Sequence, residues 1–152
     1  MSGTIKQGGI VSILPTKEKL LLACRTAPRE QHPVLGAAHL LAGLHTKRRR
    51  LALGATTDID RRRARLVLAV DRWVATELPI AHGGAHMHTE TVGTVVDRLA
   101  MLSTRAHDTL LTAPPWLIHD AWESLAELAV GYEDLACEIG TGRRRLPRRA
   151  EP

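Results

Sequence analysis

The sequence predicts an all-α protein, an antiparallel four-helix bundle with a short extra N-terminal helix. Hydrophobic residues make up 44% of the 152 residues, but aromatics only 3%, and phenylalanine is absent. The core must therefore be built from Leu, Val and Ala, which suit helices better than sheets. Four long segments also repeat apolar residues at intervals of three and four, and short connections join them. A chain of this length with this pattern indicates a single bundle domain.

Proline, glycine and capping residues set the expected helix bounds. Pro15 and Pro33 suit first helical turns, because proline lacks the N–H that a first turn leaves free. Thr57 followed by Asp60 is a capping-box-like start, and Pro79 closes the helix that follows. The expected helices span about residues 15–25, 33–53, 57–78, 89–113 and 116–139.

These bounds divide the chain into three parts. Residues 1–14 are expected to be weakly ordered, and residues 15–140 to form the helical domain. Residues 141–152 are rich in arginine and contain Pro147, which predicts a flexible basic tail.

The net charge of +5 is unevenly spread along the chain. Arginine runs lie at residues 48–50, 61–63 and 143–145, whereas the last long helix is acidic. Nucleic-acid binding would favour aromatic side chains interleaved with the basic runs, and the three tryptophans and one tyrosine lie elsewhere. We therefore expect no specific nucleic-acid complex, because folding or self-association alone explains the charge pattern.

The expected location is the cytoplasm, without membrane attachment. No stretch approaches the roughly 18 apolar residues of a membrane span, and the first residues lack a signal-peptide pattern. Cys24 and Cys137 lie far apart in apolar helical patterns. We expect both to be buried free thiols.

The candidate site begins in a histidine-rich loop and continues into the fourth helix. Glu90 and Asp97 are seven residues apart, almost two helical turns, so they project from nearly the same side. Such a carboxylate pair, assisted by His88, would hold or move a proton. The alternative is a solvated helix face, since both acids point away from the apolar stripe, and Glu90 would then only stabilise the helix N-terminus.

Arg63 interrupts the apolar stripe of the third helix. A guanidinium there needs an acid, and an antiparallel neighbour places Glu90 or Asp97 beside it. The alternative is that Arg63 lies near the bundle end and reaches water along its apolar stem.

Metal binding is considered for His82, His86, His88 and Glu90, which are suitable ligands for zinc or iron. The loop lacks a His-Glu-x-x-His helix, which fixes such ligands rigidly. We therefore predict no metal site and no cofactor. His39 and His45, on the flanks of the second helix, are interpreted as packing residues, and no serine or cysteine has the setting of a nucleophile.

Two stretches of the fourth helix resemble a known family. Thr89–Gly93 (TETVG) and Val96–Leu102 (VDRLAML) are similar to signature motifs of the bacterial all-helical family called domain of unknown function 4254. Arg63 and Asp71 match the ends of a further motif of that family. The resemblance covers roughly residues 33–145. It implies a helical fold and draws attention to Arg63, Glu90 and Asp97, but it implies no particular activity.

Together these features suggest a small helical enzyme that performs acid–base chemistry on a polar or anionic metabolite in specialised biosynthesis. Glu90, Asp97 and His88 are the predicted catalytic residues. Arg63, Arg98 and Thr91 are the predicted substrate-binding residues. The alternative is a non-enzymatic interaction module that acts as a homodimer through its arginine runs and acidic last helix. The sequence alone does not decide whether the protein is an enzyme.

Overall fold

A computed structural model describes residues 13–148 of the chain and confirms the all-α class. It contains five helices and two very short strands: α1 (Lys17–Ala23), α2 (Pro33–Arg50), α3 (Thr57–Glu77), β1 (His86–Met87), α4 (Val92–Thr112), α5 (Pro115–Gly140) and β2 (Arg144–Arg145). Each helix lies close to its predicted range. The difference that matters for the site is the start of α4, which begins after Glu90.

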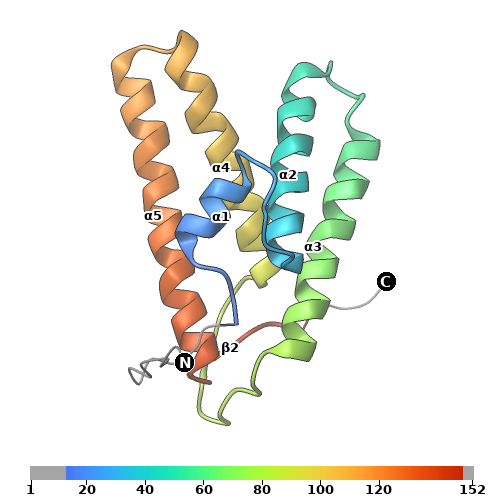
Figure 1. Ribbon diagram of the computed structural model, residues 1–152, viewed down its shortest axis with the longest axis vertical. Coiled ribbons are helices and arrows are strands. Elements are labelled where there is room, and N and C mark those ends of the chain that lie inside the picture. Colours follow the sequence, from blue (N-terminus) through green and yellow to red (C-terminus); the bar gives the residue numbers. More distant parts are fainter. Residues whose placement is uncertain (1–12, 149–152) are drawn as a thin grey trace, which may run out of the picture.

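The four long helices alternate in direction along the chain, and α4 is the central one (Figure 1). It packs against all four other helices, whereas α5 packs against α4 and α1 and does not contact α2 or α3. The predicted four-helix bundle is therefore not closed by direct contact between α5 and α2. The short helix α1 lies between them instead, with Leu20 and Ala23 buried.

The core consists of aliphatic side chains, as the composition predicts. Val34, Ala38, Leu41, Val96 and Ala100 are almost completely buried where α2 and α4 meet. The many alanines allow the helices to approach closely. The one tyrosine joins this core, and its hydroxyl donates a hydrogen bond to the carbonyl of Pro15, at 2.7 Å.

The start of α4 approaches α3 most closely at Gly93. A Cβ atom at this position would collide with the carbonyl oxygen of Val67. The Gly93 amide donates a 2.8 Å hydrogen bond to Oδ1 of Asp71, on α3. The glycine is required here because two helix backbones come together, and Asp71 binds the free N–H of the first turn.

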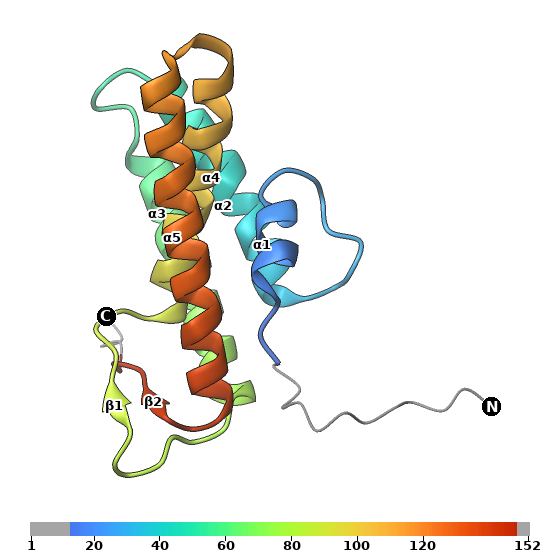
Figure 2. The ribbon, with the colours of Figure 1, turned by 90° about the vertical axis from the view of Figure 1, so that its left-hand side faces the viewer.

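The histidine loop and the first part of the basic tail are joined at one end of the molecule (Figure 2). β1 and β2 form a parallel pair, and the amide of His88 donates to the carbonyl of Arg145 at 2.7 Å. The amide of His82 donates to the carbonyl of Gly142 at 2.9 Å. Residues 142–145, which belong to the predicted flexible tail, are therefore held against the loop. The predictions for residues 1–12 and 149–152 lie outside the described residues.

The two cysteines differ from each other. Cys24 is partly buried, and burial raises the pKa of its thiol to about 11. Cys137 is exposed, so the prediction that it is buried was wrong. Cys137 lies on α5 directly after Ala136, which belongs to the core. Both thiols are free, as predicted.

No helix among residues 13–148 has both the length and the hydropathy needed to span a bilayer.

Candidate functional site

The predicted pairing of Glu90 with Asp97 is not present. Thr91 is the N-cap of α4, with an extended backbone and a side-chain oxygen that accepts from the amide of Thr94 at 3.2 Å. Glu90 thus precedes the helix, so the helical spacing that would align it with Asp97 does not apply. Its carboxylate is instead 2.8 Å from a guanidinium nitrogen of Arg98.

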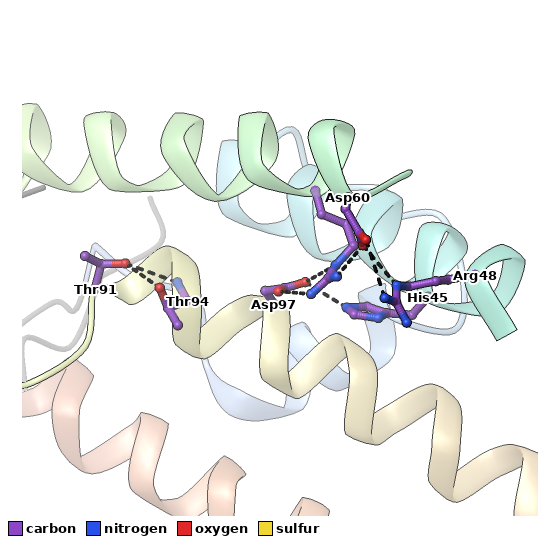
Figure 3. Close-up of polar contacts among 7 residues, drawn as sticks. His45, Arg48, Asp60, Thr91, Thr94 and Asp97 are labelled. Carbon is purple, nitrogen blue, oxygen red and sulfur yellow. Dashed lines mark hydrogen bonds and ion pairs between the residues drawn. The ribbon is translucent and has the colours of Figure 1, made fainter. Parts of the chain in front are cut away.

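The predicted roles of His88, Arg98 and Thr91 receive no support from this geometry. Nδ1 of the His88 ring lies 2.9 Å from the carbonyl oxygen and 3.1 Å from the amide nitrogen of Glu90, and these contacts shape the turn into α4. The Arg98 side chain is exposed, and its guanidinium group forms an ion pair with Glu90. The Thr91 side chain caps α4 and also contacts the hydroxyl of Thr94. Figure 3 shows that this cap lies apart from Asp97, further toward the start of α4. None of these three side chains lines a cavity described below.

Asp97 lies at the centre of a different set of contacts, between α2, α3 and α4 (Figure 3). Arg63 donates to both of its carboxylate oxygens, from Nη2 to Oδ2 at 2.7 Å and from Nε to Oδ1 at 3.3 Å. His45, on α2, approaches Oδ1 with Nε2 at 2.7 Å. The side chains of Asp97, Arg63 and His45 are only 15%, 23% and 6% exposed. The acidic partner expected for Arg63 is therefore present, and it is Asp97 rather than Glu90.

The contacts extend from Arg63 to the surface. Its Nη1 donates to Oδ1 of Asp60 at 2.9 Å, and Nε of Arg48 donates to the same oxygen at 2.9 Å. Asp60 was predicted to belong to a capping box, but it is occupied in these ion pairs, and the N-cap of α3 is Thr56 without a side-chain hydrogen bond. We call His45, Arg48, Asp60, Arg63 and Asp97 the Asp97 network.

The protonation state of the buried pair follows from these contacts. Burial alone would raise the pKa of Asp97, but hydrogen bonds from His45 and Arg63 and their charges lower it below its usual value. The carboxylate is thus ionised at neutral pH and only accepts. Nε2 of His45 must then carry a hydrogen, which leaves Nδ1 as the nitrogen that can bind or release a further proton.

A cavity of about 200 Å³ lies beside His45, between α2 and α4. Its other lining residues are Arg48, Arg49, Met101, Thr104 and Arg105. Arg48 and Arg49 form ion pairs with Asp60 and Asp108. The cavity thus combines a histidine oriented by a carboxylate with several guanidinium groups. This combination can bind an anion and exchange a proton with it.

The histidine loop contains no comparable cluster. Within residues 13–148, no group of three or more His, Cys, Asp or Glu side chains is arranged to hold a metal ion.

Residues 46–114 match the family model described as Protein of unknown function (DUF4254). The resemblance predicted from the motifs of α4 is confirmed over this narrower range. It includes the end of α2, all of α3 and α4, and four of the five residues of the Asp97 network; His45 lies just outside. The description of the family names no activity. No curated protein and no solved structure matches the chain.

The predicted site residues did not include His45, Arg48 and Asp60 of the Asp97 network, nor Arg49 and Arg105 of the cavity. Asp60 had a signal, because it is three residues before Arg63 on the same helix, a spacing at which side chains meet. His45 and Arg105 had none, because their position depends on how α2 and α4 pack together.

Proposed function

We propose that the protein is an enzyme that performs acid–base chemistry on a small anionic metabolite bound between α2 and α4. The observation that carries this proposal is the position of His45, which is held by the part-buried carboxylate of Asp97 at the wall of a cationic cavity. The proposed reaction class is the one expected from the sequence, but the proposed residues differ. The cytoplasmic location and a place in specialised biosynthesis stay predictions from the sequence.

In this proposal His45 is the general acid–base. Asp97 fixes the ring by its 2.7 Å hydrogen bond to Nε2 and stabilises the imidazolium that forms when Nδ1 takes a proton. Arg63 is a positioning residue, because its two hydrogen bonds keep Asp97 ionised and oriented. Histidine is suited to this role because a ring nitrogen can take up a proton and release it again.

The test is a comparison of substrate consumption by two histidine variants of the same helix. His45→Gln keeps an N–H that can donate to Asp97 but has no group that titrates near neutral pH. His39→Gln is the control, because the His39 ring contacts the carbonyl of Ala23 and does not line the cavity. Each protein is incubated with a metabolite extract, and mass spectrometry follows which compounds disappear and which form.

We expect the wild type and His39→Gln to convert the same compound and His45→Gln to convert it at least a hundredfold more slowly. Equal conversion by His45→Gln would remove His45 from the mechanism. An extract unchanged by the wild type would argue against an enzyme.

A second candidate function is the interaction module, acting as a homodimer. The observation that favours it is an exposed apolar group at the turn between α4 and α5. Leu110, Leu111 and Trp116 are 53%, 88% and 71% exposed there. Large apolar side chains gathered on a surface mark a contact site in many proteins.

The molar mass in solution tests whether the protein forms a homodimer. The chain has a mass of 16.6 kDa. If the turn forms a dimer interface, light scattering gives twice this mass at low and high salt, and Leu111→Lys returns it to the monomer value. A wild type that is monomeric at every salt concentration would exclude the homodimer.

A further inference from the structure

Arg105, on α4, differs from the other arginines of the cavity. Arg48 is paired with Asp60, and Arg49 with Asp108. Within the part of the chain that the structure describes, Arg105 has no hydrogen bond or ion pair through its side chain. It therefore presents an uncompensated charge to the cavity.

The charges around the cavity can be balanced as a set. Four guanidinium groups line the cavity or are connected to it through the Asp97 network. Three carboxylates pair with them, so one positive charge is in excess. The groups are Arg48, Arg49, Arg63, Arg105, Asp60, Asp97 and Asp108. One positive charge is left when His45 is neutral, and two when it is protonated. A ligand with a single negative charge thus neutralises the cavity without any proton being taken up.

The size and the remaining walls restrict the ligand further. A cavity of 150 Å³ holds a benzene molecule, so about 200 Å³ has room for a slightly larger compound. Met101 adds an apolar wall. The Thr104 hydroxyl donates to the backbone carbonyl of Met101 at 2.9 Å, so the donors open to an anion are the arginines.

We propose that the cavity binds a small organic acid with one carboxylate, held by Arg105, with His45 beside the part of the molecule that reacts. This inference rests on the function proposed above and names its substrate class. A phosphate dianion has one negative charge too many for the cavity, unless the phosphate or His45 takes up a proton at the same time. The carboxylate is preferred because it requires no such uptake.

The experiment is isothermal titration calorimetry of the full-length protein with sodium benzoate and with inorganic phosphate. It is run at about pH 8, where an ordinary imidazole is neutral, in two buffers with different heats of ionisation. Arg105→Met tests the contact. This variant keeps the apolar stem and removes a group without a partner, so it is expected to fold. Arg98→Met is the matched control, because Arg98 lies on the same helix, pairs with Glu90 and does not line the cavity.

We expect benzoate to bind in a one-to-one ratio with the same heat in both buffers, which means no net proton uptake. Arg105→Met should weaken this binding at least tenfold, and Arg98→Met should leave it unchanged. Phosphate should bind more weakly than benzoate, and with net uptake of a proton.

Three results would overturn the inference: no binding of benzoate, benzoate binding that Arg105→Met does not weaken, or tighter binding of phosphate without proton uptake. Each can be told apart from failure of the proposed function. If His45 is needed for conversion of a metabolite but benzoate does not bind, the function stands and the ligand class is wrong. If benzoate binds through Arg105 but His45→Gln has full activity, the binding site stands and the acid–base role is wrong.

Discussion

Two carboxylates near the start of α4 are each paired with an arginine, and their surroundings differ. Glu90 lies before the helix, is 33% exposed, and is paired with Arg98, which is 47% exposed. Asp97 is 15% exposed and shared between Arg63 and His45. Water can replace either partner of the first pair, but it has little access to the second. The same pair of residue types therefore contributes differently to stability, and only the buried pair also orients a titratable ring beside a cavity.

The largest expected difference between the two regions is in the free energy of unfolding after loss of the acid. Asp97→Ala leaves Arg63 and His45 without their common partner. Removing one side of a fully buried pair costs roughly 3–5 kcal/mol, and this part-buried pair should come near the lower end of that range. Glu90→Ala breaks an exposed pair, which contributes about 1 kcal/mol or less. Urea denaturation of the two variants measures both values. Equal losses would mean that burial does not distinguish the two regions.

The next effect is the coupling between Arg63 and Asp97. Methionine suits the apolar stripe of α3, so Arg63→Met should destabilise less than Asp97→Ala, although it leaves Asp97 bound to His45 alone. The free energy of unfolding lost in the double variant should be smaller, by roughly 1–3 kcal/mol, than the sum of the losses in the two single variants. The same cycle on Glu90 and Arg98 should give a coupling below about 1 kcal/mol. Additive losses in the first cycle would contradict the bidentate contact.

A smaller effect distinguishes the regions by their response to acid. The pKa of Asp97 is lowered in the folded protein by His45 and Arg63, against the opposing effect of burial. The unfolded chain therefore binds a proton at higher pH than the folded one does. The stabilisation by Asp97 is complete above the ordinary pKa of about 3.9 and is lost as the pH falls through the lower, folded value.

Denaturation curves of the wild type and Asp97→Asn from neutral pH to about pH 2 test this expectation. The wild type should lose stability more steeply with acid than Asp97→Asn, which has no proton to gain at this position. Parallel curves would show that the carboxylate titrates alike in the folded and unfolded chain.

The smallest expected effect concerns the contact between the histidine loop and the end of the chain. Nε of Arg145 donates to the carbonyl of Ala85 at 2.9 Å. Arg145→Ala should lower global stability by only about 0.5–1 kcal/mol, but it should speed hydrogen exchange at the amide of His88, which bonds to residue 145. Arg148→Ala is the control, because Arg148 is exposed and lies outside both short strands. Equal exchange in both variants would argue against a local role for Arg145.

The helices could be predicted from the sequence because their signals are local. Apolar residues at helical spacing, with Pro33 at the start of α2 and Pro79 after α3, define each segment without knowledge of its neighbours. The pairing of β1 with β2 had no such signal, since it joins residues 86–87 to 144–145 across almost sixty positions. The contact of α1 with α5 depends in the same way on distant packing.

The candidate site was predicted in part, for the same reason. Arg63 attracted attention because a charge in an apolar stripe needs a partner, and Asp97 was one of the two partners expected. Glu90 was misplaced because Thr89 and Thr91 both suit an N-cap, and the choice of Thr91 leaves Glu90 outside the helix. His45 could not be assigned to Asp97, because nothing in the sequence fixes the register between α2 and α4.

The close approach at Gly93 has a mechanical consequence for Asp97. The first turn of α4 is held against α3 at this point, with its amide bound to Asp71 and no space for a side chain. Asp97 is four residues further on, about 6 Å along the helix axis. A larger side chain at position 93 would push the first turn of α4 away from α3 and tilt the helix. The tilt would move Asp97 away from Arg63 without altering either residue. Gly93 has no side chain and does not line the cavity, yet it helps in this way to place the carboxylate that binds the His45 ring.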